Sequence, residues 1–135
     1  MTPVEFEPSP ALRALCVVAV VAMVAQLLLL AEPAFAARIV SLTWDKLIHF
    51  AFFAAIAFLL WVSTDKRWPL VIWVTVLLIG ALDETHQAFV PGRTADINDL
   101  LADGFGAAAA LMVMKRVSPP GSLAANARAR STRGE

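Results

Sequence analysis

Four stretches of the chain are almost wholly apolar, and short polar segments separate them. The stretches predict membrane spans over residues 11–31, 46–62, 69–89 and 96–115. About 20 helical residues, each rising about 1.5 Å, cross the roughly 30 Å hydrocarbon core of a bilayer. The pattern therefore predicts an all-α fold: a small polytopic membrane bundle of four transmembrane helices.

Several boundaries between these stretches carry signals for helix ends. Thr43 suits the N-cap of the second helix, and Pro69 suits the first position of the third. Pro91-Gly92 fits the middle of a type II turn. We expect either Thr94 or Asp96 to cap the fourth helix.

The two ends of the chain lack a core-forming pattern. Residues 1–10, with three prolines, predict a disordered leader, and residues 117–135 predict a disordered basic tail around a domain of residues 11–116. Ala34-Phe35-Ala36 also resembles a signal-peptidase site, so cleavage of residues 1–36 is an open alternative. Against it stand the mixed charge of the leader and the length of the apolar stretch.

The composition favours a membrane protein over a soluble one. It also argues against nucleic-acid binding and against a fold held by a disulfide or a zinc motif. The chain is 59% hydrophobic and 16% charged, against about 45–50% and about 25% in soluble domains. A soluble helical protein with an unusually apolar core is the less favoured alternative. A net charge of zero leaves no basic face for nucleic acid, and the single Cys16 allows neither an internal disulfide nor a zinc motif.

The distribution of positive residues in the loops and at the ends of the spans predicts how the chain is oriented in the membrane. Eight of the 11 Lys and Arg residues lie at the start of the first span, in the 63–68 turn, or at the end of the fourth span and in the tail, which four spans place on one side. Positive residues favour the cytoplasmic side. We therefore expect both termini in the cytoplasm.

Ionisable residues gather at the opposite, extracytoplasmic ends of the last three helices. Asp45 and His49 are four residues apart and share a helix face, and Asp96, Asp99 and Asp103 share another. Charged groups near hydrocarbon are costly, so a convergent set of them indicates a functional site. We predict a hydrated polar pocket between these helices.

The third helix contributes a further group to this predicted pocket. By spacing, Asp83 pairs with His86 and Gln87, while Glu84 points elsewhere. Arg93, in the following turn, is placed to hold a phosphate or carboxylate. The predicted ligand-binding residues are Asp45, Lys46, His49, Asp83, Gln87, Arg93, Asp99 and Asp103.

Catalysis and metal binding are less strongly indicated. The catalytic candidates are His49, Asp83, Glu84 and Asp99, which suit acid–base chemistry. No fixed ligand spacing marks a metal site, and no cofactor is expected, although imidazole and carboxylates are ligands that a divalent cation accepts.

Structural roles for the same residues stay open. Asp96 could serve only as a cap, Lys46 as an interfacial anchor, and Asp83 with Arg93 as an ion pair that holds the loop. The small residues Gly80, Gly104 and Gly106 predict a surface for close helix packing.

These elements, in their order, resemble the VanZ-like family of bacterial membrane proteins. The matching stretches are Asp45-Lys46-x-x-His49-Phe50, then Asp83-Glu84-x-x-Gln87-x-Phe89-x-Pro91-Gly92-Arg93, then Asp99 with Gly106. Together they span residues 44 to about 114. The chain departs from the family in Asp103, where Asn is usual, and in Phe52-Phe53, where a Tyr is common.

The resemblance implies a multi-pass protein of the bacterial inner membrane. The founding member is associated with low-level resistance to teicoplanin, so the resemblance implies a link to the cell envelope and to glycopeptide resistance. The leading hypothesis is a non-enzymatic protein that binds an anionic envelope component, such as a lipid-linked phosphate. The alternative is an intramembrane hydrolase or transferase, acid–base or metal-dependent, that acts on an envelope lipid. Proton translocation is disfavoured because the inner halves of the spans lack ionisable groups.

Overall fold

A computed structural model describes residues 7–29, 42–91 and 93–117. The described residues form four helices and no strands: α1 (Pro10–Leu29), α3 (Leu42–Ser63), α4 (Pro69–Gln87) and α5 (Ile97–Val117). Each helix is long and apolar enough to cross a membrane. The predicted all-α architecture with four transmembrane helices is confirmed.

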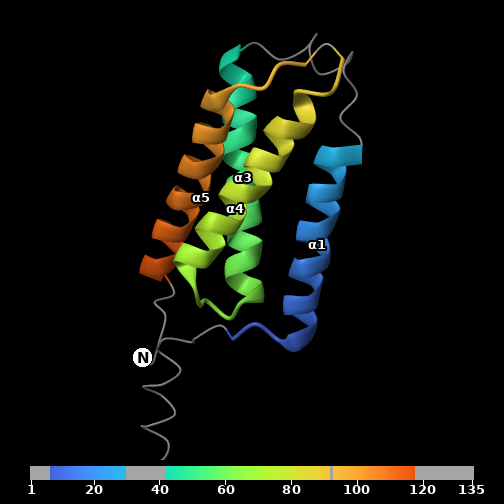
Figure 1. The fold of residues 1–135 in the computed structure, drawn as a ribbon. Helices are drawn as coiled ribbons and strands as arrows, with labels where there is room; N and C mark the ends of the chain where they lie inside the picture. Colours follow the sequence, from blue (N-terminus) through green and yellow to red (C-terminus); the bar gives the residue numbers. More distant parts are fainter. Residues whose placement is uncertain (1–6, 30–41, 92, 118–135) are drawn as a thin grey trace, which may run out of the picture.

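Helix α3 is the central element of the bundle (Figure 1). It packs most extensively against α5 and also contacts α1 and α4. Helix α1 lies at the edge, where it contacts α3 and, over a smaller area, α4. The last three helices therefore form a compact unit, and α1 covers one side of it.

Small residues on α5 allow it to approach α3 closely. A Cβ atom at Gly106 would overlap the backbone carbonyl of Phe50. Close to this contact, the Trp73 indole N–H donates to the Gly104 carbonyl at 3.0 Å and so joins α4 to α5. The predicted packing surface of small residues is confirmed, and at Gly106 it brings the backbones of α3 and α5 together.

The apolar core occupies the middle of the bundle and the end where α3 passes into α4. Its most deeply buried side chains are Phe53, Ile56, Ala57, Trp61, Val76 and Ala107. Large apolar side chains such as Leu15, Leu70 and Leu78 cover the outer faces of the helices and are exposed in the isolated chain. In a bilayer these faces meet lipid, which suits helices apolar on all sides.

The helix starts follow local chemistry, with one correction. Pro69 opens α4 as predicted. Asp96 rather than Thr94 caps α5, because its Oδ1 accepts the backbone N–H of Asn98 at 2.9 Å. The prediction of Thr43 as a cap is wrong: α3 begins at Leu42, so Thr43 lies in its first turn.

Several predictions fall on other parts of the chain. Most of the leader, the cleavage site at 34–36, Gly92 and the tail beyond Val117 lie outside the described residues. Beside Gly92, the Arg93 N–H donates to the Val90 carbonyl at 3.1 Å. This bond closes a tight turn that leads into α5.

Candidate functional site

Polar side chains meet where α3 begins, α4 ends and α5 begins. Successive spanning helices run in alternate directions, so these three helix ends share one end of the bundle (Figure 1). We call this set the polar cluster; it consists of Asp45, Lys46, His49, Asp83, Glu84, Gln87, Asp96, Asp99 and Asp103. All but Asp45, Lys46 and Asp96 are buried.

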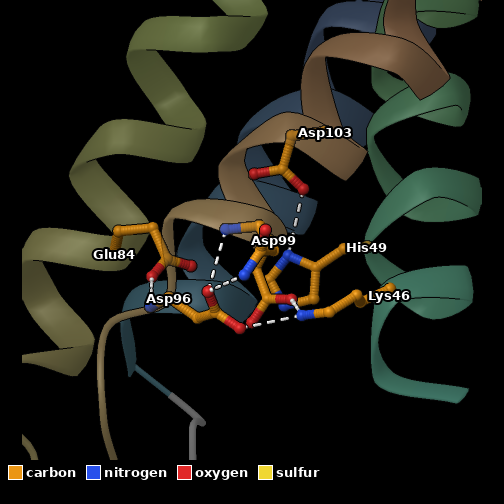
Figure 2. A network of polar contacts seen from close by, with 7 residues as sticks. Lys46, His49, Glu84, Asp96, Asp99 and Asp103 are labelled. Carbon is orange, nitrogen blue, oxygen red and sulfur yellow. Dashed lines mark hydrogen bonds and ion pairs between the residues drawn. The ribbon is translucent and has the colours of Figure 1, made fainter. Parts of the chain in front are cut away.

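Lys46 joins the start of α3 to the start of α5. Its ammonium group donates to Asp96 Oδ2 at 2.8 Å and to Asp99 Oδ1 at 2.7 Å (Figure 2). Together with the N–H of Asn98, the Lys46 ammonium lowers the pKa of Asp96 to about 2. Lys46 is therefore an inter-helix bridge, and the alternative of a simple interfacial anchor does not describe it.

His49 and Asp103 form a second, deeper link between α3 and α5. His49 Nδ1 lies 3.0 Å from Asp103 Oδ1, and both residues are buried. The imidazole also stacks on Phe53, with ring centroids 6.1 Å apart. This packing orients the ring, and its second nitrogen faces away from Asp103 (Figure 2).

Helix α4 supplies two adjacent carboxylates. Asp83 Oδ2 accepts from the Gln87 side-chain amide at 2.8 Å, as the spacing predicts. The other predicted partner, His86, forms no hydrogen bond with Asp83, and its Nδ1 has no partner among the described residues. Glu84 Oε2 accepts the backbone N–H of Asp96 at 2.6 Å and ties the end of α4 to the start of α5. The prediction that Glu84 points elsewhere is wrong: Glu84 bonds to the start of α5, and both Glu84 and Asp83 bring a ligand atom within 4.8 Å of one on His49 in α3.

Arg93 lies beside the polar cluster without joining its bonds. Its charge acts on Asp83 through space, but the two side chains form no ion pair, so the structural pair considered above is absent. The half-buried Arg93 guanidinium makes no hydrogen bond with the residues that the structure describes.

The side chains of the polar cluster are bonded to one another. A cavity of about 330 Å³ lies between α3 and α4 at the opposite end of the bundle, lined by residues that include Leu60, Thr64 and Ile72. It offers almost no polar surface. The side chains able to bind a polar ligand or to take part in a reaction are therefore those of the polar cluster and Arg93.

Two sets of three residues in the cluster bring potential metal ligands together. They are Asp45, His49 and Asp99, and His49, Asp83 and Glu84; within each set the ligand atoms lie within 4.8 Å of one another. Sequence spacing could not reveal the second set, because its members come from α3 and α4 and meet only through tertiary packing. The sequence did place all four catalytic candidates, His49, Asp83, Glu84 and Asp99, at this end, and the structure brings them together.

Comparison with protein families gives a match over most of the chain. The sequence model of the family described as VanZ/LLP1 matches residues 9–118, which is most of the chain and all four helices. This agrees with the resemblance that the motifs indicate. Comparisons with curated proteins and with solved structures give no significant match.

Proposed function

The chain belongs to the VanZ/LLP1 family, and we propose that it binds an anionic component of the bacterial cell envelope, such as a lipid-linked phosphate, at the polar cluster. The proposal places the protein in the inner membrane with both termini in the cytoplasm and the cluster at the extracytoplasmic side. The positive residues at the start of the first span, in the 63–68 turn, and at the end of the fourth span and in the tail support this orientation.

The observation that carries the proposal is the guanidinium of Arg93, which forms no ion pair or hydrogen bond with the described residues. A half-buried cation beside buried carboxylates ordinarily forms an ion pair with one of them, and Arg93 does not. A guanidinium holds a phosphate through two parallel hydrogen bonds. Its position in the turn before α5 lets a lipid headgroup reach it from the membrane surface.

Binding of farnesyl phosphate to the detergent-solubilised protein tests the proposal, with farnesol as the ligand without phosphate. We expect Arg93→Ala to weaken farnesyl phosphate binding by roughly 10- to 100-fold, because a charged hydrogen-bonded contact contributes about 1.5–3 kcal/mol. Arg93→Lys keeps the charge but loses the two-point contact, so its affinity should be intermediate. Arg116→Ala, at the exposed far end of α5, is the matched control. Equal affinities of wild type and Arg93→Ala would contradict the proposal.

The link to glycopeptide resistance is part of the same proposal and rests on family membership. Expression of the wild-type chain should raise the teicoplanin concentration that a sensitive bacterium tolerates, and Arg93→Ala should not. If neither the wild-type chain nor Arg93→Ala raises the tolerated teicoplanin concentration, envelope binding and resistance would be independent properties.

One observation favours the alternative, an intramembrane hydrolase or transferase. The buried His49–Asp103 pair is oriented so that the second ring nitrogen can accept a proton or hold a metal ion. Release of phosphate or transfer of a headgroup from a lipid-linked phosphate, lost in His49→Gln, would support this function. Binding of farnesyl phosphate without any turnover would favour the non-enzymatic proposal.

A further inference from the structure

The polar cluster contains more carboxyl groups than permanent cations. Six carboxylates, those of Asp45, Asp83, Glu84, Asp96, Asp99 and Asp103, meet there. The permanent cations nearby are Lys46, which already bridges two of the acids, and Arg93, which pairs with none. Carboxylates removed from water need protons or cations to offset their charge.

One buried oxygen indicates where such a cation would bind. Glu84 is 8% exposed, and its Oε1 has no hydrogen-bond partner among the described residues. Its other oxygen is held by the Asp96 N–H, so the carboxyl group cannot turn away without losing that bond. Glu84, His49 and Asp83 each offer one ligand atom, and these three atoms lie within 4.8 Å of one another.

The second ring nitrogen of His49, Nε2, is positioned to bind a metal ion. An ionised Asp103 accepts a hydrogen bond only from a protonated Nδ1, and in the neutral imidazole this tautomer leaves Nε2 with a free electron pair. A carboxylate behind a histidine in this way fixes the ring and raises its basicity as a metal ligand. Asp83 is equally available, because Gln87 occupies only one of its two oxygens.

From this geometry we infer that His49, Asp83 and Glu84 bind a divalent transition-metal ion, with Asp103 as the positioning residue behind His49. One imidazole with carboxylates suits Zn²⁺ or Mn²⁺ better than Mg²⁺ or Ca²⁺, which prefer oxygen ligands alone. A zinc ion at about 2.0–2.2 Å from its ligands keeps them roughly 3.5 Å apart, so small side-chain rotations close the site.

The alternative set of Asp45, His49 and Asp99 is less suitable. Asp99 Oδ1 is already bonded to the Lys46 ammonium at 2.7 Å, and that positive charge repels a metal ion. Asp45 is only partly buried. The two sets share His49 but differ in their carboxylates, so variants of the carboxylates distinguish them.

Zinc binding to the full chain in detergent tests the inference. The protein carries a purification tag without histidines, is stripped with a chelator, and is titrated with Zn²⁺ by calorimetry and by elemental analysis after desalting. We expect one Zn²⁺ per chain, at least tenfold weaker binding in Glu84→Gln and His49→Gln, and unchanged binding in Asp45→Asn. Asp103→Asn should weaken binding about tenfold without removing a ligand, in keeping with a positioning role.

Two controls keep the result interpretable. Glu7→Gln makes the same chemical change as Glu84→Gln on an exposed residue and should leave binding unchanged. X-ray absorption at the zinc edge of the unmutated protein should show one imidazole nitrogen among oxygen ligands, and this measurement is independent of how any variant folds.

Three results would overturn the inference: a wild-type chain that retains no Zn²⁺ or Mn²⁺, Zn²⁺ binding unaffected by Glu84→Gln, or binding lost in Asp45→Asn but kept in Glu84→Gln. Metal binding is measured without lipid, and it goes beyond the proposed function. If no metal ion binds, the Arg93-dependent binding of farnesyl phosphate would be unaffected. If farnesyl phosphate does not bind, the metal site would be unaffected.

Discussion

The two ends of the α3–α4–α5 unit are held together in different ways. At the end where α3 passes into α4, Trp61, Ile56 and Val76 are almost completely buried and interlock as apolar side chains. At the other end, Lys46, His49 and Glu84 link the helices through ion pairs and hydrogen bonds. Apolar side chains at the second end would hold the helices as well, so its expensive polar groups indicate a function rather than a need for stability.

The largest effect is expected at the apolar end, from Trp61→Ala. Trp61 is 1% exposed, and truncation of such a large buried side chain leaves a cavity that costs about 3–5 kcal/mol. The free energy of unfolding, measured by SDS titration with circular dichroism, should fall by that amount. Trp61→Phe is the sharper control: it keeps much of the ring packing and removes an indole N–H without a partner, so its cost should be much smaller. Equal losses in the two variants would show that packing is not what holds this end.

An intermediate effect is expected where α3 and α5 touch. Gly106→Ala forces a Cβ into the Phe50 carbonyl, which cannot move without its helix, and should cost about 1–3 kcal/mol. It should also separate His49 from Asp103 and so disturb the polar cluster. Gly104→Ala is the matched control, because the added Cβ meets only the end of the flexible Leu77 side chain, 2.9 Å away. A Gly104→Ala variant as unstable as Gly106→Ala would contradict the close backbone contact.

The smallest effect is expected at the polar end, from Lys46→Met. Lys46 and Asp96 are partly exposed and only Asp99 is buried, so the contribution of these ion pairs is modest and partly screened by salt. The melting temperature should fall slightly at low salt, and the difference from wild type should shrink as salt is raised. Lys115→Met, in the exposed last turn of α5, should show no such salt dependence. A large salt-independent loss would instead mean that the polar end carries the stability of the bundle.

Residue spacing predicted the links within a helix and near its ends. Asp83 does pair with Gln87 four residues later, and Asp96 does cap α5. These outcomes depend on helix geometry alone, which is the same in every helix. The prediction for Glu84 failed because it needed more than helix geometry. Which residues of α4 face a neighbouring helix depends on how far α4 is rotated against α3 and α5.

The sequence alone determined that the chain forms four membrane-spanning helices, that alternate helix directions bring the ionisable groups of three of them to one end, and that the chain resembles the VanZ-like family. The tertiary structure decided the partners: Lys46 with Asp96 and Asp99, His49 with Asp103, and Glu84 rather than Arg93 inside the polar cluster. The reason is physical. Hydropathy and helical period act along the chain, whereas these contacts depend on the rotation and close approach of helices that small residues such as Gly106 permit.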